Sequence, residues 1–391
     1  MKIITKTITS QNQDGKKDKK HLVYFFGLND CIRDDESEQQ RWEDWEGQSI
    51  GIHMFNYHYS ENDYPEHFHN IKFKLKRALI TTIVASALGF IGYSIIASKM
   101  PISLKVPIFI TFLIPAIITA AIVIFYPYTV PLLKFATRGK DPVKAGMAKV
   151  IDLLEKGVRP DDIILMGNSL GGGIAAEVLQ KFEKANIHFT MVHSNSYSSV
   201  QKAISCLYGR FVAILGKWFG FNYKPNEIIK STKAPVLIVN KIGDKVIPKK
   251  VQSIHGLKSQ VNNKDSTDNL KVLVTLEHKD KRYSHCYDIH NTDEFEMGIS
   301  NTDYLGSKRL KNNEYKSYKE LLWDFIDAAH KHLKELNKDF NLNNFKQSKL
   351  YQKMKKNGVS LIDIDDVPNG NFITDSCKPQ KGTDAVNSYK C

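Results

Sequence analysis

Cysteine is scarce in this chain of 391 residues, which contains five cysteines. They are widely scattered and no two form a C-x-x-C pair: Cys31, Cys206, Cys286, Cys377 and Cys391. Disulfide frameworks and zinc sites both need cysteines at short, regular spacings. The sequence therefore predicts neither, and we expect a reducing compartment, no metal and no cofactor.

Two further signals are absent from the sequence. The first twenty residues lack the apolar region of a secretory signal, and Cys391 does not form a prenylation box.

The net charge of +13 would suit a nucleic acid or an anionic membrane surface, but no nucleic-acid motif accompanies it. We therefore expect no nucleic acid partner and a lipid bilayer instead.

Charged residues are also missing from two long stretches, 78–98 and 106–126, each of 21 residues. Each is long enough to cross a hydrocarbon core of about 30 Å as a helix. The short segment 99–105 between them predicts a transmembrane hairpin, and the alternative is a pair of buried core helices. Seven basic residues flank this hairpin and two lie in its turn: Lys72, Lys74, Lys76, Arg77, Lys134, Arg138 and Lys140 against Lys99 and Lys105. This asymmetry predicts a multi-pass membrane protein with two spans and its catalytic domain in the cytosol.

Outside the hairpin, strand-like and helix-like segments alternate along the chain. The predicted strands are 21–26, 49–55, 163–166, 188–192, 235–240 and 271–276, and the clearest predicted helices are 36–46, 141–157 and 314–337. This alternation predicts a parallel sheet covered by helices on both faces. The predicted organisation is 1–71 for the first strands, 72–134 for the hairpin, 135–340 for the rest of the domain and 341–391 for a polar, flexible tail.

The most informative motif is the pentapeptide Gly167-Asn168-Ser169-Leu170-Gly171. A strand-like run precedes it and a helix-like run follows it. Strand, G-x-S-x-G and helix in this order are typical of a nucleophile elbow, a tight turn that exposes the serine beside a helix N-terminus. We therefore predict that Ser169 is a nucleophile, and the alternative is a structural glycine-rich turn.

This arrangement resembles the α/β-hydrolase superfamily, and the chain looks like a membrane-anchored serine hydrolase of that kind. The resemblance implies a parallel sheet flanked by helices, with the hairpin inserted, and a triad in the order serine, acid, histidine. Asp244 matches the acid in its Gly243-Asp244 turn, and the alternative is a solvated turn aspartate. The histidine should follow the last strand, where His285 is the prediction and His278 and His290 are expected to lie at the surface.

The same resemblance implies where an oxyanion would bind. One backbone donor should be the N–H of Leu170, directly after the nucleophile, and the other the N–H of Leu28. Phe26 stands where the family usually has histidine, and Asn168 stands where many members have histidine or tyrosine.

Segment 196–222 stands where the family inserts a cap. Its apolar residues fall on one helical face and either pack on the sheet or form a lipophilic wall beside the serine. With the hairpin, this predicts a lipase-, esterase- or thioesterase-like enzyme that cleaves an acyl-ester or thioester substrate. A tethered peptidase or small-ester hydrolase and a non-catalytic membrane scaffold are the alternatives. Residues 195–199 are also similar to a stretch of lipase-like effectors from intracellular bacteria.

Overall fold

The structure is a computed structural model, and it describes part of the chain. The described residues are 2–8, 20–27, 42, 50–55, 141–218, 222–242, 244, 247–258, 269–277, 298–305, 308–310, 315–358 and 360–363. The chain divides into two compact units, one made of Met1–Tyr59 with Gly139–Cys391 and the other of Ser60–Arg138. All described residues belong to the first unit.

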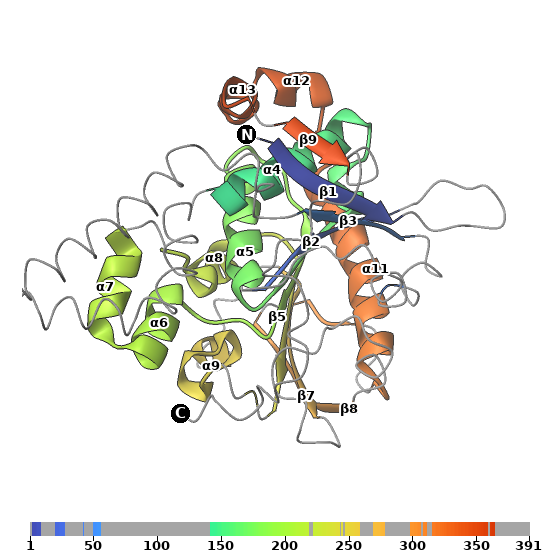
Figure 1. Ribbon diagram of the computed structural model, residues 1–391. Helices are drawn as coiled ribbons and strands as arrows, with labels where there is room; N and C mark the ends of the chain where they lie inside the picture. The colour runs from blue at the N-terminus through green and yellow to red at the C-terminus, as the bar shows by residue number, and fades with distance from the viewer. Residues whose placement is uncertain are drawn as a thin grey trace, which may run out of the picture. The chain divides into compact units, whose positions relative to one another are not determined.

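The first unit is built around one mixed sheet (Figure 1). Among the described residues the strand order is β8-β7-β6-β5-β4-β2-β3-β1-β9. The strands are β1 (Lys2–Ile8), β2 (Lys20–Phe25), β3 (Ile50–Phe55), β4 (Ile163–Asn168), β5 (Thr190–Ser194), β6 (Val236–Lys241), β7 (Lys271–Glu277), β8 (Gly298–Tyr304) and β9 (Ser360–Asp363). The six central strands, from β7 to β3, are mutually parallel, whereas β1 and β8 run antiparallel to their inner neighbours.

The six predicted strands are confirmed to within two residues at each end, and they are the six parallel ones. Their side chains are buried almost throughout, as expected for strands covered on both faces. The predicted strand 188–192 begins instead at Thr190. The reason is Asn337, whose side chain accepts from His188 N at 3.0 Å and donates to His188 O at 2.8 Å, in place of a strand partner.

Helices cover both faces of the sheet (Figure 1). Figure 1 shows α4 (Asp141–Glu155), α5 (Leu170–Glu183) and α8 (Pro225–Ser231) on one side and α11 (Tyr318–Leu336) on the other. The predicted helices 141–157 and 314–337 are confirmed as α4 and α11 with shorter ends. Smaller helices are α6 (Val200–Tyr208), α7 (Arg210–Trp218), α9 (Ser253–Lys258), α12 (Leu342–Gln347), α13 (Lys349–Lys356), and the 3-10 turns η2 (Pro160–Asp162) and η3 (Lys249–Val251).

The prediction of a flexible tail from residue 341 is wrong for residues 342–358 and 360–363. The side chain of Phe345 in α12 is buried against Phe182, with ring centroids 5.9 Å apart. The hydroxyl of Tyr351 donates to Glu155 of α4, and Lys355 lies 2.9 Å from the same carboxylate. Strand β9 then pairs in parallel with β1 at the edge of the sheet. The segment is polar in composition, but Phe345 of α12 and Tyr351 and Met354 of α13 are buried. Residues 364–391 lie outside the described residues.

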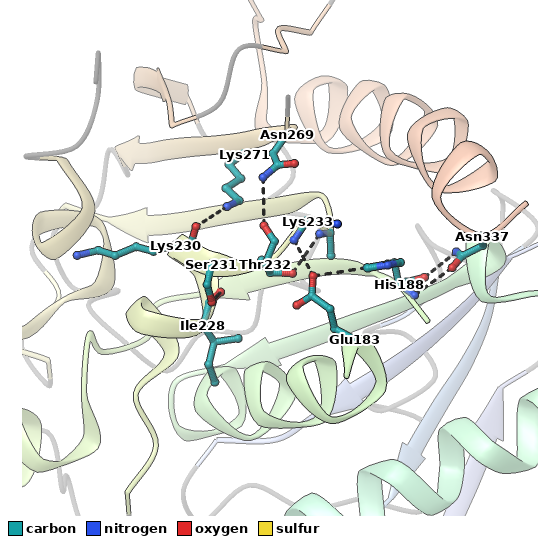
Figure 2. A network of polar contacts seen from close by, with 11 residues as sticks. Glu183, His188, Ile228, Lys230, Ser231, Thr232, Lys233, Asn269, Lys271 and Asn337 are labelled. Atoms are coloured by element: carbon teal, nitrogen blue, oxygen red, sulfur yellow. Dashed lines mark hydrogen bonds and ion pairs between the residues drawn. The ribbon is translucent and has the colours of Figure 1, made fainter. Parts of the chain in front are cut away.

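A polar network fixes the edge of the sheet at which β5, β6 and β7 begin (Figure 2). The carboxylate of Glu183, the last residue of α5, accepts from Lys233 N at 2.6 Å and lies 3.5 Å from His188 Nδ1. Lys271 donates to the carbonyl of Lys230 at the end of α8, and burial lowers its pKa to about 8. Since α5 begins directly after Ser169, this network anchors the far end of the helix that follows the predicted nucleophile.

Two predicted structural elements fall outside the described residues. The hairpin 72–134 is one, and helix 36–46 is the other apart from Trp42, whose ring is buried edge-on against Tyr24. None of the helices that the structure describes is long and apolar enough to cross a membrane.

We predict that Phe345→Ala lowers the free energy of unfolding by about 3 kcal/mol, because it leaves a cavity between α12 and the ring of Phe182. Denaturant unfolding followed by tryptophan fluorescence measures this loss. Lys353→Ala, which truncates an exposed side chain of α13, is the control and should change stability by less than about 0.5 kcal/mol. Equal stability of the two variants would show that the tail is not part of the core.

Candidate active site

Ser169 occupies the sharp turn between β4 and α5. Its backbone has φ 51° and ψ −117°, a left-handed conformation that residues other than glycine rarely adopt. Such a conformation costs about 1–3 kcal/mol and persists only where its surroundings enforce it. Here Ser169 N donates to Ser194 O at 3.0 Å, and Gly172 N donates to Ser169 O at 3.2 Å. The predicted strand, turn and helix are therefore present with the backbone geometry of an elbow.

The glycines around Ser169 are required by close backbone contacts. A side chain on Gly171 would overlap the carbonyl oxygens of Phe25 and Phe26, at the end of β2. A side chain on Gly167 would lie 2.6 Å from Gly172 N, across the turn. The first turn of α5 thus packs directly on neighbouring backbone, which leaves no space for larger residues.

The end of β2 also lies against the serine. A Cβ placed on Gly27 would be 3.5 Å from Ser169 Cβ, so the segment that follows β2 begins beside the elbow. Leu28, predicted as one oxyanion donor, comes next and lies outside the described residues. Leu170, predicted as the other, is the first residue of α5, and its N–H has no acceptor four residues earlier within the helix.

Asp244 follows β6, two strands from β4. Because β4, β5 and β6 are parallel, Ser169 and Asp244 lie at the same edge of the sheet, where these strands end. The side chain of Asp244 is 9% exposed, and its Oδ1 accepts from Ile247 N at 3.0 Å. This carboxylate is buried in the turn, unlike the solvated aspartate that was the alternative.

The predicted histidine, His285, lies outside the described residues, as do His278 and His290. The strand before them is not the last one, which corrects the sequence analysis, because β8 follows and pairs antiparallel with β7. Glu277 at the end of β7 lies opposite Gly298 at the start of β8, and both of these residues lie at the edge that holds Ser169 and Asp244. β8 was missed because it is a polar edge strand without an apolar run.

A hydroxyl-rich segment after β5 contacts the elbow, whereas the sequence analysis assigned Ser196 and Tyr197 only to the start of the cap. Ser196 Oγ donates to the carbonyl of Ser169 at 2.6 Å, and Tyr197 O–H donates to the carbonyl of Leu170 at 3.4 Å. Asn195 adopts φ 41°, and its Oδ1 accepts from Lys241 N at 3.0 Å, which ties this segment to the end of β6. The sequence feature that could have indicated this contact is the run of three polar residues after β5, Asn195, Ser196 and Tyr197.

The predicted cap is two helices rather than one continuous face. Gly209, with φ 90°, separates α6 from α7. Val200 and Ile204 of α6 are buried, whereas Ile214 of α7 is 54% exposed. The first helix therefore packs on the domain, and the second presents an apolar side chain to solvent.

A buried imidazole lies under the elbow without being part of the predicted triad. His193 of β5 is fully buried, and its Nε2 is 2.7 Å from Ser253 Oγ, which donates in turn to Tyr197 O at 2.7 Å. Burial lowers the pKa of His193 to about 4. His193 is therefore neutral at pH 7 and supports the segment that contacts the elbow.

Within the described part of the chain, one cluster has metal-ligand residue types: Asp161, Asp162 and His330. These side chains already have partners, because Arg159 donates to Asp161 at 3.1 Å and His330 Nδ1 lies 3.3 Å from Asp162. Asp161 and Asp162 precede β4, at the opposite end of that strand from Ser169. The cluster has no part in the site.

No family model and no curated protein matches this sequence. Among solved structures, the chain is similar to an acetyl xylan esterase from Paenibacillus sp. R4, with 11% identity, a TM-score of 0.42, and coverage of 84% of this chain and 79% of the esterase. Est1E from Butyrivibrio proteoclasticus, with bound ferulic acid, gives 10% identity and a TM-score of 0.37 over 74% of this chain and 89% of Est1E. An acylaminoacyl peptidase from Pyrococcus horikoshii gives 13% identity and a TM-score of 0.39 over 74% of this chain and 36% of the peptidase.

The mixed sheet, the helices on both faces and the elbow after β4 fit an α/β-hydrolase fold.

We predict that the protein loses stability as the pH falls from 6.5 towards 4. The unfolded His193 binds a proton in this range while the buried His193 does not, so the free energy of unfolding falls by about 1.4 kcal/mol per pH unit for this residue. Burial lowers the pKa of His53 as well, which acts in the same direction. Denaturant unfolding at several pH values measures the slope. His193→Gln should flatten it, and an unchanged slope would contradict the assignment.

Proposed function

We propose that this protein is a serine hydrolase in which Ser169 attacks the acyl carbon of an ester or thioester. The observation on which the proposal depends most is the backbone of Ser169, held at φ 51° between β4 and the N-terminus of α5. This conformation presents a serine hydroxyl beside the positive end of a helix, and the fold tolerates its strain.

The remaining roles are proposed from the sequence, and Asp244 and Leu170 also lie at the edge of the sheet that holds Ser169. His285, from segment 278–297, would accept the proton of the Ser169 hydroxyl as Oγ bonds to the acyl carbon. Asp244 would orient the imidazole and stabilise its cationic form. The N–H groups of Leu170 and Leu28 would stabilise the oxyanion. His285 would then protonate the departing alcohol or thiol, and water would release the acyl group from Ser169 by the same steps in reverse.

For the substrate we propose a lipid or a lipidated molecule with an apolar acyl chain. The exposed Ile214 on α7, which follows α6, supports an apolar surface in the cap. Segment 72–134 would anchor the enzyme as a transmembrane hairpin, with the catalytic domain on the cytosolic side. The seven-to-two excess of basic residues in its flanks supports that orientation.

We predict that Ser169→Ala abolishes hydrolysis of acyl esters, and that His285→Ala lowers turnover by about a thousandfold or more. His278→Ala and His290→Ala are the matched controls, since they remove histidines from the same segment, and they should cost far less. A panel of p-nitrophenyl esters of increasing chain length measures both activity and acyl preference. Full activity of Ser169→Ala would refute the proposal, and inactivity of His278→Ala alone would reassign the base.

We also predict that replacing 78–126 by a short Gly/Ser linker yields a folded hydrolase that no longer needs detergent. The residues proposed for catalysis all lie outside this segment, so activity on short soluble esters should persist while activity on bilayer-embedded esters falls. Detergent-free gel filtration together with both assays tests this. Aggregation of the deletion variant would assign the two apolar stretches to the catalytic core.

A further inference from the structure

One peptide unit holds two groups that matter to the proposed reaction. The carbonyl of Ser169 and the N–H of Leu170 belong to the same planar amide, so the orientation of one fixes the orientation of the other. The proposed oxyanion donor therefore depends on whatever bonds to the carbonyl of Ser169.

Two donors among the described residues bond to that carbonyl. Gly172 N donates from within the first turn of α5 at 3.2 Å, and Ser196 Oγ donates from the segment after β5 at 2.6 Å. The second bond is the shorter, and its donor comes from outside the elbow. Ser196 is almost fully buried, so water does not compete for the carbonyl there.

We infer that Ser196 is a positioning residue that orients and polarises the peptide between Ser169 and Leu170, which strengthens the Leu170 N–H as an oxyanion donor. A hydrogen bond to an amide carbonyl draws electron density from its nitrogen and makes the N–H a stronger donor, because hydrogen bonds in a chain polarise one another. This inference depends on the proposed function, since an oxyanion forms only if Ser169 attacks an acyl group.

The surroundings of Ser196 hold its hydroxyl in place. Ser253 N donates to Ser196 O at 2.9 Å, and Tyr197 forms an isolated antiparallel bridge with Gln252. On the other side, a Cβ on Gly172 would lie 2.6 Å from Ser196 Oγ, so glycine at 172 is what allows the hydroxyl to approach.

The segment that contains Gln252 and Ser253 also supports Asp244, the proposed acid. Gln252 Nε2 donates to Ile247 O at 2.9 Å, and Ile247 N donates to Asp244 Oδ1 at 3.0 Å. Gln252 and Ser253 thus brace both the segment that contacts the nucleophile and the turn that presents the acid. Ser196 has a fixed position relative to both.

The test compares Ser196→Ala and Ser196→Cys with the wild type on a short-chain p-nitrophenyl ester. Ser196→Ala should lower kcat about tenfold, with KM changed by less than about twofold, because the bond acts on the oxyanion and not on bound ester. Ser196→Cys has a similar shape and a weaker donor, so its kcat should lie between the two. Binding of a boronic acid that forms a tetrahedral adduct should weaken by the same factor as kcat.

The matched control is Ser231→Ala. This hydroxyl also donates to backbone carbonyls, those of Glu227 at 3.1 Å and Ile228 at 3.2 Å, but at the end of α8. Its removal should leave kcat unchanged. If Ser196→Ala does not fold, the kcat of Ser196→Cys alone tests the role of Ser196.

The outcomes separate this inference from the proposed function. Wild-type kcat in a folded Ser196 variant, or a loss confined to KM, would overturn the role of Ser196 while Ser169→Ala remained inactive. Activity in Ser169→Ala, or no hydrolysis by the wild type, would overturn the proposed function and this inference with it.

Discussion

The close approach of the first turn of α5 to the end of β2 is the constraint on which the rest of the site depends. Gly171 lies against the carbonyl oxygens of Phe25 and Phe26, and Gly27 lies against Ser169. At these distances the backbone of α5 can leave β4 only through a sharp turn, and Ser169 adopts its left-handed conformation in that turn. The strain of the serine therefore follows from packing between backbones, which side-chain changes elsewhere would alter little.

The rest of the domain keeps α5 in this position. At its far end Glu183 binds the amide of Lys233, near His188 and Asn337 (Figure 2). Burial acts against ionisation of Glu183, but hydrogen bonds to His188, Lys233 and Thr232 outweigh it and lower the pKa of this carboxylate. Near its first turn, Ser196 and Tyr197 bind the carbonyls of Ser169 and Leu170. A helix fixed at both ends gives the serine a defined position, which a reaction that needs alignment requires.

Much of this arrangement could be predicted from the sequence, and the failures have physical causes. The parallel strands were predictable because strands buried on both faces are apolar runs, as in Ile163–Asn168. Among the described strands, β8 and β9 lie at the two edges of the sheet, and β1 lies between β3 and β9. All three contain polar residues, so their composition does not separate them from loops. The tail was misjudged because its stability comes from contacts with α4 and α5, which no local pattern shows.

The positions of Ser169 and Asp244 were predictable because each lies in a short turn directly after an apolar strand. The residues that mark each turn, the glycines around Ser169 and the Gly243-Asp244 pair, are neighbours in the sequence. The role of Ser196 was not predictable, since its hydrogen bond joins two segments 27 residues apart. His285, Leu28 and the hairpin remain predictions from the sequence.

The most direct test of the central claim is to map the site that a fluorophosphonate modifies in the unaltered protein. Such a probe reacts with a serine only where a base removes its proton and an oxyanion site stabilises the adduct. The account predicts one phosphonyl group per chain, located by peptide mass spectrometry on the peptide that contains Ser169. Modification of another residue, or no modification of a folded protein, would contradict it.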